Sequence, residues 1–428
     1  MSSPEPTSSA HPTPVSAANG APADPAQGPQ PAEPVLVPLS APSEGIPEVI
    51  NTAPGLNRAI RALRGGQGAL AVDTERASGF RYGQRAFLIQ LRREGAGTWL
   101  IDPEELDTLQ PLADFVNSEA WVLHAATQDL PCLHAEGLYP DELFDTELAG
   151  RLAGFPRVAL GTMVAQLLNL KLAKEHSAVD WSTRPLPESW LNYAALDVEV
   201  LLDLRERMEA VLAEQHKLEF ARQEFEYVRT MPEAEPPAEP WRRLSGIHKL
   251  KNRRALAIAR ELWLARDALA RSRDVAPGRL LSDSAIMVAV QHRPSSVPQL
   301  LQIPGFHGRS AKRDAPRWLD AISRGKRTQD VPDLRQAGNG LPNPRAWTEK
   351  NPAAADRLGA AKAAVTEVSE AWNIPAENLI TPKYLRQLAW EPPTSASAPA
   401  VEEALEQLGA RPWQRELLRA PLATALAK

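Results

Sequence analysis

The feature that most constrains this chain is a short apolar run, ALAV at residues 69–72, followed by Asp-Thr-Glu at 73–75. An apolar run of this length predicts a buried strand. Because side chains alternate faces along a strand, Asp73 and Glu75 should point the same way. Two like charges this close repel each other, and burial in a protein core would raise the free energy further. A shared cation would resolve the conflict, so the pair is a candidate for part of a metal site.

Composition limits the classes of protein to which the chain can belong. Its 428 residues, 43% of them hydrophobic, are enough for several domains with real cores. The net charge of -5 confines any nucleic-acid-binding surface to a local patch. The single cysteine, Cys132, excludes an internal disulfide and suits a reducing compartment. No apolar run approaches the roughly 20 residues of a membrane span, and no signal-peptide pattern is present, so we expect a cytoplasmic protein.

The first half of the chain predicts an α/β domain after a disordered tail. Residues 1–46 are rich in Pro, Ala and Ser, and their composition is typical of disorder. Residues 47–229 alternate apolar runs with amphipathic helices, which predicts a mixed sheet with helices packed on it. After the first strand, the strand candidates are 86–91, 98–102, 121–125 and 143–145. The first three strands should be antiparallel neighbours because their connections resemble hairpins.

Beyond residue 240 only helices are predicted. An acidic, proline-rich linker occupies 230–240, and a second linker, rich in Gly and Pro, occupies 326–345. Short helices fill 241–325, and further helices fill 346–428. These two helical segments could be divergent copies of one module.

Two further carboxylates could complete the metal site. Asp129 follows the fourth strand, where α/β proteins collect functional residues, although a helix-capping role is the alternative. Asp197 lies four residues after Tyr193, so both should share one face of a largely apolar helix. An exposed pair on a surface helix is the alternative there. Oxygen ligands without a cysteine or histidine cluster favour Mg²⁺ or Mn²⁺ over Zn²⁺.

Four carboxylates of this kind can support phosphodiester cleavage with two divalent ions about 4 Å apart. We expect Asp73 to bridge both ions, Glu75 and Asp197 to hold the ion that carries the attacking water, and Asp129 to hold the other ion. A tyrosine has an ordinary pKa of about 10, so Tyr193 is expected to orient the water rather than to act as a strong base.

The same residues carry a resemblance to a known family. Asp-Thr-Glu at 73–75, HAATQD at 124–129 and YAALD at 193–197 resemble the three exonuclease motifs of the DEDD superfamily, in its tyrosine-bearing branch. FDT at 144–146 and DWSTRPL at 180–186 add similarity to the ribonuclease D family. The resemblance implies a ribonuclease H-like fold and a 3′-to-5′ exonuclease that removes nucleotides from RNA ends, such as those of tRNA precursors.

The helical half resembles the HRDC domain, a module shared by helicases and the ribonuclease D family. The similarity covers 239–322 and includes IPG at 303–305. Residues 346–425 are similar to a second copy, although a proline-rich loop breaks their helices. In that family the module assists nucleic-acid binding.

Basic residues at the start of the first helical segment are candidates for RNA binding. Residues 241–273 hold ten Lys or Arg and two acids, a local excess that suits phosphate contacts, with a solvated helix face as the alternative. The candidates in this patch are Arg242, Arg243, Lys249, Lys251, Arg253 and Arg254. In the α/β domain the candidates are Gln90, His124 and Arg184, with Lys174 and His176 near the last, and a structural role is the alternative for each.

These patterns predict a metal-dependent, monomeric 3′-to-5′ exoribonuclease that acts on structured RNA ends. A DNA exonuclease is the nearer alternative, because no residue in the sequence indicates a contact to the 2′-OH group. An inactive nucleic-acid-binding scaffold is the second alternative, and the complete set of four acids argues against it.

Overall fold

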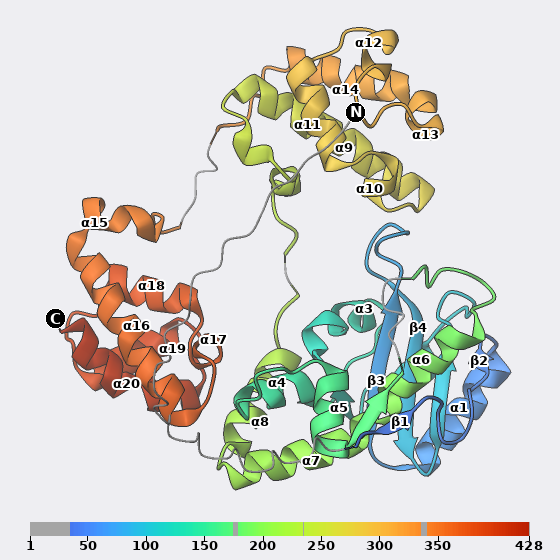
Figure 1. Ribbon diagram of the computed structural model, residues 1–428, viewed down its shortest axis with the longest axis vertical. Coiled ribbons are helices and arrows are strands. Elements are labelled where there is room, and N and C mark those ends of the chain that lie inside the picture. Colours follow the sequence, from blue (N-terminus) through green and yellow to red (C-terminus); the bar gives the residue numbers. More distant parts are fainter. Residues whose placement is uncertain (1–34, 174–178, 234, 335–339, 428) are drawn as a thin grey trace, which may run out of the picture. The chain divides into compact units, whose positions relative to one another are not determined.

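The structure is a computed structural model that describes residues 35–173, 179–233, 235–334 and 340–427. Residues up to 229 form a sheet with helices around it, whereas residues 240–327 and 344–426 form helices (Figure 1). The fold class is the one predicted: a mixed-sheet α/β region followed by helical regions.

A six-stranded sheet in the order β2-β5-β4-β3-β6-β7 organises the α/β region. Strand β3 is antiparallel to β4 and parallel to β6, and β4 is antiparallel to β5. The predicted antiparallel arrangement of the first three strands is therefore confirmed. The strands of this sheet are β2 (Val49–Ile50), β3 (Gln67–Arg76), β4 (Ala86–Glu94), β5 (Gly97–Ile101), β6 (Ala120–Leu123) and β7 (Glu142–Asp145).

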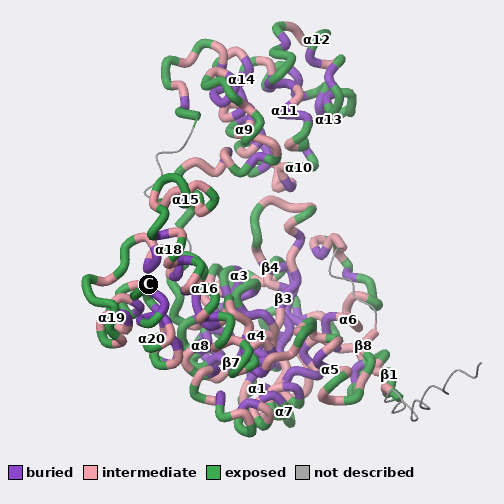
Figure 2. Tube along the Cα trace, turned by 60° about the vertical axis from the view of Figure 1, so that its left-hand side comes forward, coloured by how far each residue is buried: buried purple, intermediate pink, exposed green. Residues whose placement is uncertain are grey.

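Strand β3 has apolar side chains on both faces, and both faces are covered (Figure 2). Leu70 and Val72 belong to a core that includes the buried face of the first helix. Ala71 points the other way and packs with Val198 and Leu201. Because side chains alternate, Asp73 and Glu75 continue the face of Ala71, while Thr74 and Arg76 continue the opposite face.

The helices of the α/β region begin where capping residues allow. The Thr52 hydroxyl accepts a hydrogen bond from the Gly55 N–H at the start of α1, whose apolar positions at 56, 59, 60 and 63 are buried. The helices here are α1 (Ala53–Gly65), α2 (Gln110–Val116), α3 (Leu130–Ala135), α4 (Thr146–Leu152), α5 (Leu160–Leu168), α6 (Glu188–Glu199), α7 (Leu201–Glu214) and α8 (Leu218–Arg229). Helix α6 contacts β3, β4 and β5, which places it over the face that carries Asp73.

The predicted tail of residues 1–46 extends too far. Residues 1–34 lie outside the described chain, but β1 (Val37–Leu39) pairs in parallel with β8 (Leu170–Leu172) in a two-stranded sheet. The prediction of disorder was therefore wrong for this segment. Val37 and Leu39 alternate with Pro38, which is the period of a strand, and proline is tolerated on edge strands.

The first helical region has its own core of buried apolar residues. Its longest helix, α9, begins after the Asn252 cap and ends at Asp274, which adopts a left-handed conformation with φ 48°. The elements are η2 (Pro240–Arg243), η3 (Ile247–Lys249), α9 (Arg253–Arg273), α10 (Pro277–Leu280), α11 (Asp283–His292), α12 (Val297–Leu301), α13 (Arg309–Arg313) and α14 (Ala315–Arg327).

The second helical region repeats this order of elements. Helices α9 and α16 are each 21 residues long, and each is followed by a left-handed residue and a four-residue helix. The left-handed residues are Asp274 and Asn373, types that tolerate this conformation. The elements are η4 (Pro344–Ala346), α15 (Trp347–Lys350), α16 (Pro352–Trp372), α17 (Ala376–Leu379), α18 (Pro382–Trp390), α19 (Ala398–Gln407) and α20 (Pro412–Leu426). The repeated order supports the interpretation that the two regions are copies of one module.

Neither helical region contains a strand within its described residues, as predicted. Among all the helices described for this chain, none has the length and apolar character that a membrane crossing requires.

Candidate metal centre

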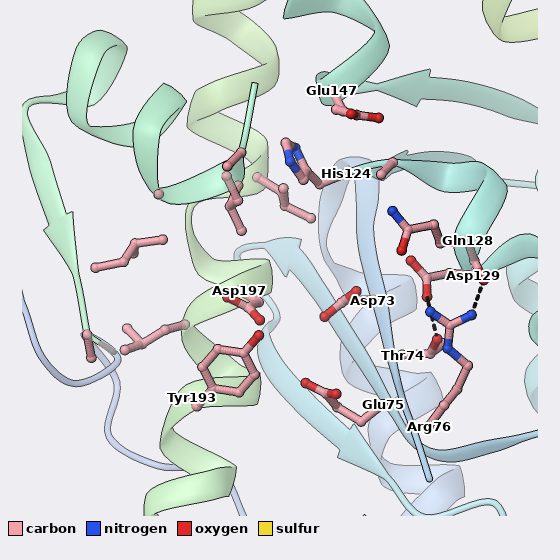
Figure 3. A pocket seen from close by; sticks show the side chains of 18 of the residues that line it. Asp73, Thr74, Glu75, Arg76, His124, Gln128, Asp129, Glu147, Tyr193 and Asp197 are labelled. Carbon is pink, nitrogen blue, oxygen red and sulfur yellow. Dashed lines mark hydrogen bonds and ion pairs between the residues drawn. The ribbon is translucent and has the colours of Figure 1, made fainter. Parts of the chain in front are cut away.

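Strand β3 and helix α6 bring three carboxylates together. Asp73 and Glu75 come from β3 and Asp197 comes from α6, and each offers an oxygen within 4.8 Å of the others. These side chains line a pocket of about 1370 Å³ and point toward one another across it (Figure 3). The structure therefore places three of the four predicted acids in one group.

The protonation behaviour of these acids indicates a need for positive charge. The pKa of Asp73 is raised well above its usual range, first by burial and then by the negative charges of Asp129 and Asp197. The pKa of Glu75 is raised by burial and then by the charge of Asp73. A divalent cation bound between the carboxylates would offset this repulsion. An all-oxygen donor set fits Mg²⁺ or Mn²⁺, so the residues present suit the predicted ions.

Asp129 approaches the group from beside β3. It precedes α3, but its side chain makes no capping hydrogen bond there, so the helix-capping alternative does not account for it. The Thr74 hydroxyl donates to Asp129 Oδ1 at 2.9 Å, and Arg76 Nη2 lies 3.4 Å from the same oxygen. Burial raises the pKa of Asp129 to about 6, and the charge of Arg76 and the hydrogen bond from Thr74 limit this rise.

A second buried carboxylate fixes the turn that carries Asp129. Asp145, at the end of β7, accepts hydrogen bonds from the N–H groups of Ala125 and Ala126 at 3.0 and 2.9 Å. It also accepts the N–H groups of Glu147 and Leu148 at the start of α4. The sequence analysis did not assign Asp145 a role, although an aspartate just before a helix is a typical capping pattern.

Tyr193 lies one helical turn from Asp197, as predicted, and its phenol is beside that carboxylate (Figure 3). The phenol is hydrogen-bonded to Asp197. Burial and the negative charges of Asp197 and Glu75 raise the pKa of Tyr193 above its ordinary value. The phenol therefore stays protonated near neutral pH and can donate a hydrogen bond.

The structure contradicts the predicted RNA contact of Gln90. This side chain is 0% exposed and lies directly opposite Asp73 in the β3–β4 register, so RNA cannot reach it. Its amide N and O have no hydrogen-bond partner among the described residues. The sequence placed Gln90 near the site but gave no sign that α6 covers it.

Arg184 also has a structural role in place of the predicted RNA contact. Its guanidinium donates to both carboxylate oxygens of buried Asp102. The remaining donors reach the carbonyl oxygens of Phe87, Trp181 and Thr183. With every N–H engaged, no donor is left for a phosphate, and the prediction for this residue was wrong.

We expect Arg184→Ala to lower the free energy of unfolding by about 3 kcal/mol, because it leaves the Asp102 carboxylate buried and unpaired. Denaturant unfolding measures this loss. Exposed Arg58→Ala is the matched control and should be near neutral. A normal unfolding curve for Arg184→Ala together with weaker RNA binding would restore the original prediction.

His124 lines the same pocket, and its Nδ1 lies 2.8 Å from the Thr146 hydroxyl oxygen. Burial lowers the pKa of His124 to about 4. The ring is therefore neutral at physiological pH and would meet a phosphate as a hydrogen-bonding group without charge. Its predicted contact with RNA stays a prediction.

The predicted basic patch divides into two sets. Arg242, Arg253 and Arg254 donate to backbone carbonyl groups between residues 325 and 333. The second set comprises exposed side chains, namely Arg243, Lys249 and Lys251. The second set is better placed to meet a phosphate. Lys174 and His176 lie outside the described residues.

Comparison with known protein families divides the chain in the same way. Residues 47–213 match the 3′-5′ exonuclease family, residues 255–322 match the HRDC domain, and residues 340–426 match a 3′ to 5′ exonuclease C-terminal domain. The ribonuclease D of Jannaschia sp. is 30% identical over 73% of this chain and 82% of its own length. The ribonuclease D of Escherichia coli is 28% identical over 78% of this chain and 86% of its own.

Solved structures agree with this comparison. A crystal structure of a protein from Bifidobacterium adolescentis is 37% identical, with a TM-score of 0.82 over 92% of this chain and 100% of that one. The structure of Escherichia coli RNase D, described as an exoribonuclease involved in structured RNA processing, is 25% identical. It has a TM-score of 0.64 over 89% of this chain and 98% of its own.

Proposed function

Because this chain belongs to the ribonuclease D family of 3′-to-5′ exoribonucleases, we propose that it shortens RNA with two divalent ions held by Asp73, Glu75, Asp129 and Asp197. The observation that carries the proposal is that all four acids line one pocket, three of them as a single group. The DEDD exonucleases use divalent metals, and Mg²⁺ or Mn²⁺ is the choice that fits the oxygen ligands here.

The residues divide the work according to their positions. Asp73 contributes to both halves of the site, Glu75 and Asp197 to one half, and Asp129 to the other. Bound divalent ions would supply an activated water and would stabilise the negative charge on the leaving 3′ oxygen. Tyr193, protonated and held beside Asp197, would orient the attacking water through a hydrogen bond.

The domain bounds follow from the same observations. We assign the exonuclease domain to 47–229, the HRDC domain to 241–325 and a second HRDC-like domain to 346–428. The family matches to parts of these ranges and the repeated order of α9 and α16 support the assignment.

We expect the metal-free protein to gain stability as the pH falls. Asp129 has a folded pKa of about 6 against an ordinary value of 3.8, and the pKa values of Asp73 and Glu75 are also raised, so the folded state takes up protons that the unfolded chain does not. This contribution is complete below the ordinary pKa values and is lost as the pH rises through the folded ones. Melting temperatures measured across this range test it, with Asp73→Asn as the variant in which the contribution shrinks.

Mg²⁺ should show the opposite pH dependence, because it binds deprotonated carboxylates. Its stabilising effect should therefore grow as the pH rises through 6 and beyond. Comparing wild type with Asp73→Asn removes the background from other groups, such as His124, whose lowered pKa acts in the other direction. A Mg²⁺ effect that is the same at all pH values would contradict the proposed ligands.

We propose tRNA precursors and other structured RNAs with 3′ extensions as substrates. The supporting observation is the structured-RNA role of the Escherichia coli relative together with the helical regions that this chain adds to its exonuclease domain. The test incubates the protein and Mg²⁺ or Mn²⁺ with a 3′-extended tRNA, an unstructured RNA and a DNA strand of matched sequence. Stepwise shortening of the tRNA from its 3′ end is expected. Faster shortening of DNA would favour the DNA exonuclease, and binding without shortening would favour the scaffold.

The exposed lysines of the first helical region should contribute to long-RNA binding through phosphate contacts. Lys249→Ala combined with Lys251→Ala should weaken binding to tRNA and reduce the slope of log Kd against log salt by about 1. Binding measured at several salt concentrations tests this, and exposed Lys350→Ala with Lys383→Ala is a control of equal charge change in the second helical region. An unchanged slope in the first variant would assign these lysines to a solvated surface.

A further inference from the structure

Arg76 follows the Asp-Thr-Glu sequence directly and contacts Asp129, although the sequence gave it no role. We propose that Arg76 is a positioning residue: it is the built-in counter-cation of Asp129, and it makes binding of the second divalent ion depend on RNA. The proposal rests on the two-ion function proposed above and names the order in which that site is filled.

The contacts of Arg76 tie its charge to one side of the site. Arg76 Nη2 lies 3.4 Å from Asp129 Oδ1, and Nη1 donates to the carbonyl oxygen of Gln128 (Figure 3). Thr74 donates to the same Oδ1. The Asp129 side chain is 7% exposed and that of Arg76 is 26% exposed, so the pair is largely shielded from water. Shielding strengthens the effect of the charge on a cation that binds nearby.

The electrostatic influence of Arg76 is unequal across the four acids. For Asp129 it is the strongest influence that lowers the pKa. For Asp73 and Glu75 it is the weakest of the influences on the pKa. One half of the site therefore contains a cation before any metal binds, whereas the half formed by Asp73, Glu75 and Asp197 depends on a bound ion for compensation.

A count of formal charges shows the consequence. Four ionised carboxylates and one guanidinium carry three net negative charges. One divalent ion leaves a single negative charge, and a second ion would make the site positive. A phosphodiester of the RNA restores neutrality, so the second ion and the RNA should favour each other's binding. Without Arg76 the two ions alone would neutralise the four carboxylates, and the second ion would no longer need RNA.

The test measures Mn²⁺ binding to the RNA-free full-length protein by calorimetry and by electron paramagnetic resonance. We expect wild type to bind one Mn²⁺ tightly and a second at least about tenfold more weakly, because of the Arg76 charge. Arg76→Gln, which keeps a hydrogen-bonding side chain without the charge, should tighten the second ion by about tenfold and leave the first unchanged. An RNA with a non-hydrolysable 3′-terminal linkage should tighten the second ion in wild type more than in Arg76→Gln.

Two further variants separate charge from geometry. Arg76→Lys keeps the charge and should behave as wild type. Thr74→Val removes the other hydrogen bond to Asp129 Oδ1 without changing the charge, and it should not tighten the second ion. Second-ion binding that is unchanged or weaker in Arg76→Gln would overturn the proposal, since it is the result expected if Arg76 only holds the turn in place.

The two proposals fail in different ways. Two equally tight Mn²⁺ ions in RNA-free wild type would leave the two-ion function standing and would overturn the role of Arg76. No tight Mn²⁺ in wild type, or tight binding that survives Asp73→Asn, would overturn the proposed metal centre itself.

Discussion

Asp73→Asn is expected to lower kcat on a 3′-extended RNA by about 1000-fold or more, since loss of metal-based stabilisation costs several kcal/mol and each 1.36 kcal/mol is a factor of ten. The reason is its position: Asp73 lies between Glu75 and Asp197 on one side and Asp129 on the other (Figure 3). The amide is nearly isosteric but carries no charge, so the variant should fold while its affinity for divalent ions falls. Single-turnover RNA cleavage and Mn²⁺ titration measure the two effects.

The control for this variant is Asp114→Asn. Asp114 is exposed on α2, within the same domain, and the substitution changes charge and size in the same way. It should leave cleavage and Mn²⁺ binding unchanged. If Asp73→Asn kept more than a tenth of wild-type kcat with normal Mn²⁺ binding, Asp73 could not be the ligand shared by both halves of the site.

Tyr193→Phe is expected to lower kcat by about 100-fold, in the range found for groups that assist proton transfer or position a nucleophile. The ring packs near Trp181, with centroids 6.4 Å apart, so phenylalanine should fill the same space. Only the hydroxyl that is hydrogen-bonded to Asp197 is removed. We therefore expect Mn²⁺ affinity and KM to stay close to wild type while kcat falls.

The pH profile distinguishes an orienting phenol from a base. Because the pKa of Tyr193 is raised, the phenol stays protonated through the working range, and wild type should show no loss or gain of activity that Tyr193→Phe removes. A limb of the kcat profile that disappears in the variant would show that Tyr193 ionises during turnover. In that case bound metal would have to lower its pKa, and the residue would act as a base.

The sequence predicted the parts of this site that depend on local periodicity. Asp73 and Glu75 share a face because a strand has a period of two, and Tyr193 and Asp197 do because a helix has nearly four residues per turn. Their meeting required only that α6 cover that face of β3, which the apolar residues around Asp197 already suggested. The antiparallel order of β3, β4 and β5 followed from short connections.

The parts that could not be predicted depend on partners far away in the sequence. Arg184 is held by Asp102, 82 residues earlier, and an arginine in a loop gives no sign of such a partner. Gln90 is covered by a helix that begins almost 100 residues later. Both side chains are polar and near the site, so periodicity could not distinguish an RNA contact from a buried position.

Strand β3 carries both the proposed metal ligands and the side chains that hold Asp129, on alternate residues. Asp73 and Glu75 occupy one face, and Thr74 and Arg76 occupy the other. Insertion or deletion of a single residue before Asp73 in this strand would exchange the two sets and point the acids into the wrong core. We therefore expect length variation among relatives to be excluded from residues 67–76 and to collect in the turn between β3 and β4, where added residues leave the alternation intact.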